Sequence, residues 1–248
     1  MPDPASENAS SSSPHWFVTT HWSVVQAAGL PDSTRALAAM ESLCQAYWYP
    51  LYAYVRRSGK SPQDAEDLVQ SFFAQCLSKN YLLAADQTKG RFRSFLLMAL
   101  KRFLANEWDK ARATKRGGGH QPIALDSLSA EQRYAVEPAD LQSADKLYER
   151  RWALTLLEKV LGRLESEQTE AGNSTLFKEL KPFLTGGASD SYASLAHRIS
   201  MSEGAVKVAI HRLRQRYRAI LEDEIAETVS SAQEVQEERR YLLSVLRG

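Results

Sequence analysis

The residues between 192 and 220 have the types and the spacing of a surface that binds DNA. Apolar side chains such as Val206, Ile210 and Leu213 would form the buried face of a helix that begins after Ser202, a suitable N-cap. The opposite face carries the basic residues Lys207, His211, Arg212, Arg214 and Arg218. A short turn separates this helix from an apolar pattern at 192–199. The pair has the form of a helix-turn-helix, whose second helix contacts phosphates and base edges in the major groove.

The same pattern is also compatible with an ordinary helical hairpin that has a solvated basic face. Between Arg198 and Arg218 there are six basic residues and one acidic residue. Five basic or histidine positions on one face exceed what solubility requires. We therefore favour the DNA-binding interpretation.

A second basic segment runs from residue 89 to residue 116 and contains nine basic and two acidic residues. Its candidate DNA contacts are Lys89, Arg91, Arg93, Lys101, Arg102, Trp108, Arg112, Lys115 and Arg116. Aromatic rings interleaved with cations suit single-stranded or distorted DNA, because rings stack on bases while cations follow phosphates. Phe92, Phe95 and Phe103 fall on the apolar stripe and are expected in the core, so Trp108 is the better stacking candidate.

Three carboxylates, Asp64, Glu66 and Asp67, could be imagined as metal ligands of an enzyme. Acidic residues at a helix start more often interact with the helix dipole, and no nucleophile motif or glycine loop accompanies them. We expect a protein that is not an enzyme and needs no metal or cofactor. Cys44 and Cys76 lie in apolar helical patterns and are expected to be buried thiols.

The composition describes a chain that can bury a core. It has 248 residues, of which 44% are hydrophobic, and its 31 basic and 30 acidic residues give a net charge of +1. These values exclude a uniformly basic protein and an acidic disordered one. Residues 126–170 contain ten acidic and six basic residues, so an acidic segment separates the two basic ones. With no signal-peptide pattern and no long apolar run, we expect a cytoplasmic protein.

Helical periodicity recurs along the chain and strand alternation is absent, which predicts an all-α fold. We expect two helical domains joined by a flexible linker, and Pro50 should kink or restart the helix at 33–58. The predicted boundaries are a disordered leader at 1–18, a first domain at 19–116, a linker at 117–143, a second domain at 144–229 and a C-terminal helical extension at 230–248.

Three segments resemble the bacterial extracytoplasmic-function sigma factors. Asp64-Ala-Glu-Asp-Leu-Val-Gln-Ser-Phe-Phe and Gly90-Arg-Phe-Arg-Ser-Phe-Leu are similar to sigma region 2. Tyr192-Ala-Ser-Leu-Ala together with Met201-Ser-Glu-Gly-Ala-Val-Lys is similar to region 4. Each motif is weak alone, but the combination is specific and covers residues 41–116 and 153–221. The glycine-rich linker resembles a subgroup common in planctomycete-type bacteria.

The resemblance implies a subunit that directs core RNA polymerase to promoters, by melting the −10 element and binding the −35 element. Asp64, Asp67 and Gln70 would bind the β′ clamp, and the basic segment at 89–116 would bind −10 DNA. Ser202 and the basic residues of the second helix would bind the −35 element. The implied partners are the β′ clamp and β flap of core polymerase, promoter DNA, and an anti-sigma factor or other regulator, with no membrane.

The chain departs from the family pattern at Phe95, Arg102, Asn106, Ser200 and Val208. These departures leave the fold intact and bear on promoter preference. The alternative function is a free-standing helix-turn-helix transcriptional regulator, which would leave the basic segment at 89–116 unexplained.

The predicted linker has the length that a bridge between two promoter elements needs. Residues 117–143 span at most about 90–95 Å when extended, and the two elements lie about 70 Å apart on DNA. Because Asp126, Glu131 and Glu137 make the linker acidic, we expect it to follow a basic channel of polymerase.

Overall fold

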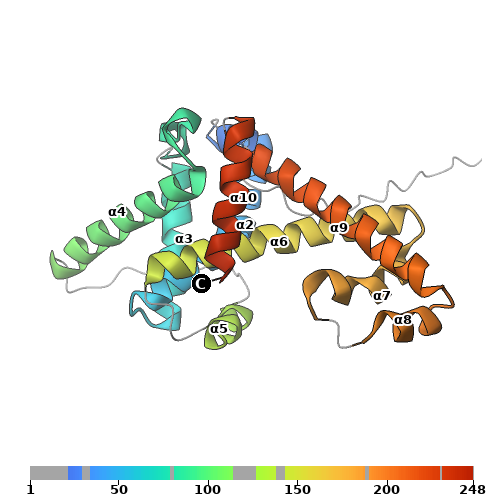
Figure 1. The fold of residues 1–248 in the computed structure, drawn as a ribbon. Helices are drawn as coiled ribbons and strands as arrows, with labels where there is room; N and C mark the ends of the chain where they lie inside the picture. The colour runs from blue at the N-terminus through green and yellow to red at the C-terminus, as the bar shows by residue number, and fades with distance from the viewer. Residues whose placement is uncertain are drawn as a thin grey trace, which may run out of the picture.

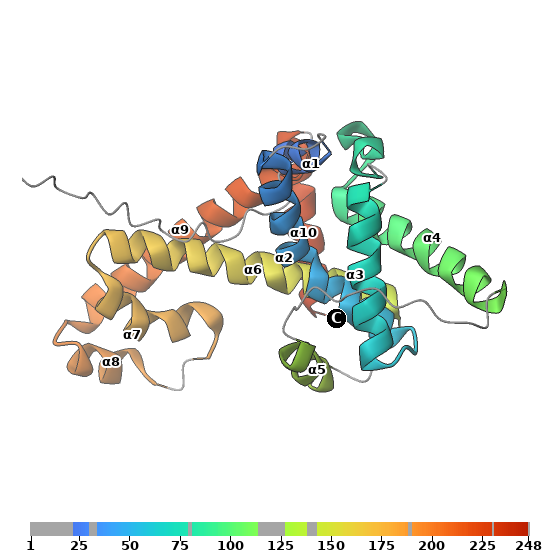
Figure 2. The same cartoon turned by 180° about the vertical axis from the view of Figure 1, so that it is seen from behind.

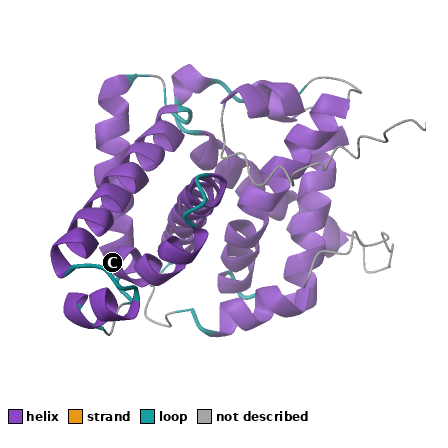
Figure 3. Cartoon of the chain, turned by 90° about the vertical axis from the view of Figure 1, so that its right-hand side faces the viewer, coloured by secondary structure: helices purple, strands orange, loops and turns teal. Residues whose placement is uncertain are grey.

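The computed structural model describes residues 22–29, 34–78, 81–113, 127–137, 143–187, 190–229 and 231–247. Within these ranges it contains ten α-helices, two short 3-10 turns and no strand (Figure 3). The predicted all-α fold is therefore confirmed for the described residues. None of their helices combines the length and the apolar character needed to cross a bilayer.

The first half of the chain forms a bundle around a long second helix. Its elements are α1 (Trp22–Ala28), α2 (Thr34–Arg57), α3 (Pro62–Ser78), the turns η1 (Tyr81–Ala84) and η2 (Gln87–Lys89), and α4 (Phe92–Ala113). The expected restart of the helix at Pro50 is wrong, because α2 runs through this residue without interruption. Pro50 removes one helical hydrogen bond, but every side chain from Tyr47 to Val55 is buried, and this packing holds the helix together.

The second half of the chain is organised by one helix that crosses the whole molecule. Its elements are α5 (Ser127–Ala135), α6 (Ala144–Glu170), α7 (Ser174–Thr185), α8 (Tyr192–Arg198), α9 (Glu203–Ala226) and α10 (Ala232–Arg247). With 27 residues, α6 is about 40 Å long. It begins near α4 and α10 and ends beside α7 and α9 (Figure 1). The predicted C-terminal helical extension corresponds to α10.

One continuous hydrophobic core joins the two halves. On α6, Tyr148, Trp152, Leu156, Val160 and Leu164 recur every four residues and are all buried. This stripe packs on α2 of the first half, as seen from behind in Figure 2, and on α7 and α9 of the second. The expected separation into two domains joined by a linker is therefore not confirmed, because α6 has an apolar surface for both halves.

Part of the predicted linker is a helix that docks on α2 through polar groups. Glu131 on α5 accepts hydrogen bonds from the Tyr52 hydroxyl at 2.6 Å and from Arg56 at 2.7 and 3.0 Å. The Arg56 hydrogen bond lowers the pKa of Glu131. Glu137 accepts a hydrogen bond from Tyr49 at 2.7 Å and pairs with Arg151.

Glu131 and Glu137 are thus already paired with groups of the same chain. The expectation that these two carboxylates face a basic channel of polymerase does not hold in this conformation. Asp126 and the other predicted linker residues at 117–126 and 138–142 lie outside the described residues. The leader predicted at 1–18 lies outside them too.

Cys76 is buried as expected and Cys44 is half-buried, and both environments predict slow thiol chemistry. Burial, with a smaller contribution from Glu41, raises the pKa of Cys44 to about 12, and burial raises the pKa of Cys76 to about 12 as well. At pH 8 a disulfide reagent should modify neither thiol on the timescale of a free cysteine, because only the thiolate reacts. Both should react once urea unfolds the chain. Rapid reaction of the native protein would contradict the burial.

Candidate nucleic-acid interface

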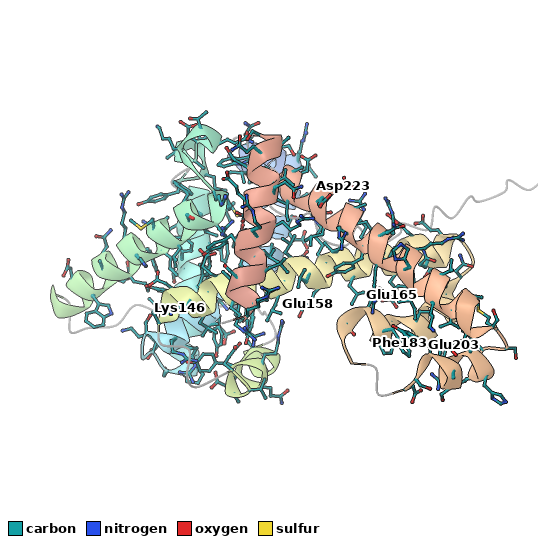
Figure 4. All side chains as sticks on the ribbon, viewed as in Figure 1. Lys146, Glu158, Glu165, Phe183, Glu203 and Asp223 are labelled. Atoms are coloured by element: carbon teal, nitrogen blue, oxygen red, sulfur yellow. The ribbon has the colours of Figure 1, made fainter. Side chains whose placement is uncertain are left out.

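Helices α8 and α9 meet at the end of the molecule to which α6 leads. Figure 4 labels Phe183 of α7 and Glu203, the first residue of α9, in this part of the molecule. The backbone N–H of Ser194 donates to Ser191 Oγ at 3.1 Å, and that of Ala205 donates to Ser202 Oγ at 3.2 Å. Each helix thus begins with a serine cap. The predicted N-cap at Ser202 is confirmed.

A buried core holds the two helices at a fixed angle. Leu195 of α8 packs with Val206 and Ile210 of α9, and all three side chains are 2% exposed or less. The ring of Phe183 stacks on Tyr192 with centroids 5.3 Å apart. Because this face of α9 is fixed in the core, the direction of its outer face is fixed as well.

The turn between the helices places a serine in the left-handed region of backbone space. Ser200 has φ of 55°, and it is the one residue other than glycine with positive φ among the described residues. Side chains with a Cβ are strained in this region, where glycine is not. The strain lies at the position where the resembled family commonly has glycine.

The centre of the outward face of α9 is formed by Gly204, Val208, His211 and Gln215. Their spacing of four, three and four residues places them in one row along the helix, and all four are exposed. Val208 is 50% exposed although it is apolar. This row has the shape of a surface that enters a groove, since small side chains at its beginning allow close approach to base edges. A search of the sequence for charged residues does not identify this row, but the helical periodicity of residues 204–215 could have identified it.

Cations flank this central row on both sides. Lys207, Arg214 and Arg218 lie on one side, and Arg212 and Arg216 lie on the other. The five basic residues predicted for this face are all exposed, as expected. Two cationic flanks match the two phosphate backbones that border a major groove.

Neighbouring groups orient several of these cations. Lys207 Nζ lies 2.6 Å from Glu203, and this hydrogen bond raises the pKa of Lys207, so the amine stays charged. Arg214 donates to the carbonyl oxygen of Phe183 at 2.8 Å. Arg216 binds both carboxylate oxygens of Glu167 at 2.7 Å each.

The basic segment on α4 divides into exposed and buried parts. Lys89 is 80% exposed near Asp86, and both Arg102 and Trp108 are exposed. The ammonium of Lys60 lies 4.7 Å from the centre of the Trp108 ring, so a cation and an aromatic face share one surface. The side chain of Arg112 lies outside the described part of the chain, as do Lys115 and Arg116.

Three other predicted DNA contacts are occupied by carboxylates of the second half. Arg93 is 5% exposed and binds Glu149 at 2.8 Å and Glu238. Arg91 pairs with Glu238 at 2.5 Å, and Lys101 pairs with Asp145. The expectation that Arg93 lies on a DNA-facing surface is wrong for this conformation, because its sequence position shows the charge but not the carboxylates that enclose it.

The predicted polymerase-binding residues lie together on one face of α3. Asp64 receives a hydrogen bond from the Ser61 hydroxyl at 2.7 Å, and its own N–H donates to that oxygen at 3.1 Å. Asp64 and Asp67 are exposed and Gln70 is half-buried. Among the described residues, no three His, Cys, Asp or Glu side chains are grouped so that they could hold a metal ion. The arrangement of Asp64, Glu66 and Asp67 thus offers no metal site.

Comparisons with protein-family models, with curated proteins and with solved structures give no significant match.

Replacing Ser200 with glycine should stabilise the protein. The substitution removes the strain of a Cβ at positive φ, and the net gain should be about 0.5 kcal/mol after the larger chain entropy of glycine. The matched control is Gly186→Ser, because Gly186 also has positive φ and has open space around it, so this change should destabilise by about 1 kcal/mol. Urea unfolding measures both. A lower unfolding free energy for Ser200→Gly would show that the serine side chain stabilises the turn.

Removal of Lys207 should weaken binding to duplex DNA through phosphate contacts. We expect Lys207→Ala to reduce the slope of log affinity against log salt by about 0.9, the value for one lost phosphate contact. Arg198→Ala is the control, since Arg198 is equally cationic but lies on α8, where it binds Glu179 at 2.9 Å and Asp190 at 2.6 Å. Equal slopes for the two variants would show that α9 does not supply the contact.

Proposed function

We propose that the protein is a promoter-specificity subunit of bacterial RNA polymerase, of the extracytoplasmic-function sigma-factor type. In this proposal α8 and α9 form region 4 and bind the −35 element in duplex DNA. The bundle of α1 to α4 is region 2, which binds core polymerase and the melted −10 element. The chain itself makes and breaks no covalent bond.

The observation that carries the proposal is the outward face of α9. It combines a fixed orientation, a capped N-terminus, a central row with small residues at its beginning, and cations on both flanks. An ordinary helical hairpin needs a solvated surface but not this division into a neutral centre and two cationic edges. The pattern fits a helix that lies in a major groove with its first turns toward the bases.

Features of the first half support the region 2 assignment. The exposed residues Asp64 and Asp67 offer a polar face for a partner helix, and Arg102, Trp108 and Lys60 offer cations and an aromatic face for unpaired DNA. A free-standing regulator would have no use for this second surface. The proposal accounts for both surfaces with one molecule.

The two DNA surfaces lie at opposite ends of the molecule. The helix-turn-helix is at one end of α6, and α4 extends from the other (Figure 1). Of the about 70 Å that separates the two promoter elements, α6 spans about 40 Å, and α4, with 22 residues, projects beyond its far end.

Run-off transcription with purified core polymerase tests the proposal directly. The protein should confer promoter-dependent initiation, and Asp67→Ala should weaken binding to core about tenfold by loss of an interface charge, with duplex binding through α9 unchanged. Glu41→Ala is the control, because Glu41 is an exposed carboxylate on α2. Failure to bind core, combined with a two-fold-symmetric footprint on DNA, would favour the free-standing regulator instead.

A further inference from the structure

The C-terminal helix α10 covers the start of α4 with a buried carboxylate. Glu238 is fully buried, and its two oxygens face Arg91 and Arg93. The Arg93 guanidinium also lies over the Trp152 ring of α6 at 4.2 Å and over the Tyr241 ring of α10 at 5.1 Å. The two arginines belong to the Gly90-Arg-Phe-Arg segment. Without α10, Arg91 would be a surface cation, whereas Arg93 would still face Glu149 and Trp152 of α6.

A carboxylate held by two arginines resembles a DNA phosphate in charge and in hydrogen-bonding geometry. Arginine binds both groups through the same planar fork of N–H donors. Lys101 and Asp145 form another ion pair about two turns further along α4, with the carboxylate again supplied by the second half of the chain. The second half thus neutralises cations of α4 that DNA could otherwise contact.

The position of α10 depends strongly on this ion pairing. Of its 16 residues only Glu238 and Leu242 are fully buried, while Val235, Val245 and Leu246 pack on the core partly buried. Its other polar ties are Arg239 to Glu222 of α9 at 2.5 Å and Arg150 of α6 to the Leu246 carbonyl at 3.0 Å. A polar cavity of about 270 Å³ beside Arg91, lined by Thr88, Glu234 and Glu237, interrupts the seam between α10 and the start of α4. Such a seam is weaker than a closed apolar core.

We propose that α10 is an intramolecular latch that occupies a DNA-binding surface. Glu238 holds Arg91 and Arg93 in the place of phosphates, and DNA that reaches the start of α4 displaces the helix. Release frees Arg91 completely and leaves Arg93 with Glu149. The inference rests on the proposed function for the identity of the DNA, but the competition itself does not need polymerase.

The first experiment compares two neutral isosteres, one on α10 and one on α2, in the full-length protein. Glu238→Gln should bind a short fluorescein-labelled single-stranded oligodeoxynucleotide of mixed sequence about tenfold more tightly than wild type, since the binding-competent state is more populated. Its salt slope should steepen by about 0.7 for each arginine that gains a phosphate contact. Glu41→Gln removes the same charge from an exposed position of α2 that does not line the cavity beside Arg91, and it should bind like wild type. Equal effects of the two variants, or none, would overturn the latch.

A second measurement needs only the wild-type protein and tests the latch even if Glu238→Gln does not fold. Hydrogen exchange of the α10 amides should accelerate when the oligodeoxynucleotide is added, while the α6 amides at 156–164 keep their protection. Unchanged protection of α10 at saturating DNA would overturn the proposal. If the wild-type protein and every variant lack run-off activity but DNA still releases α10, the proposed function is refuted and the latch is not.

Discussion

The guanidinium of Arg93 is the point on which the arrangement of the two halves depends. A buried cation is stable only if carboxylates compensate its lost hydration. Glu149 of α6 and Glu238 of α10 supply them, and the Trp152 and Tyr241 rings cover its faces. Burial lowers the Arg93 pKa, but the two carboxylates outweigh it and the pKa is raised. The Arg93 carbonyl also accepts a hydrogen bond from buried Tyr148 at 3.0 Å. One residue of α4 therefore fixes the positions of both α6 and α10.

The pairing of cations with carboxylates extends across the interface between the halves. Acidic groups of the middle segment and of α10 meet basic or phenolic groups of α2 and α4, as in the pairs of Glu131 with Arg56 and Asp145 with Lys101. These polar contacts surround an apolar seam between α2 and α6. The near-zero net charge of the chain therefore conceals opposite charges that compensate each other in the folded state.

The end of the molecule formed by α8 and α9 is stabilised differently from the interface between the halves. It relies on apolar packing and on serine caps, and most of its cations are exposed, including Arg214 and Arg216, which bind Phe183 and Glu167. Even the buried Glu224 of α9, which binds Lys159 at 2.6 Å, lies on the side that faces α6. Charge is thus internal at the junction of the halves and external at the end of α9, which is the distribution that the proposed latch and DNA surface would require.

The sequence by itself determined the helical class, the cap at Ser202 and the outward direction of Lys207, His211 and Arg212, because these follow from local periodicity and from a single short turn. It did not determine that α2 continues through Pro50, that α5 docks on α2, or that Arg93 is buried. Each of these depends on partners more than 70 residues away or on packing from several helices at once, as in Tyr52 with Glu131 and Arg93 with Glu238. A basic residue on an exposed helix and one inside a carboxylate cage have the same local pattern. Only the tertiary structure distinguishes them, because only it brings the opposite charge to within hydrogen-bonding distance.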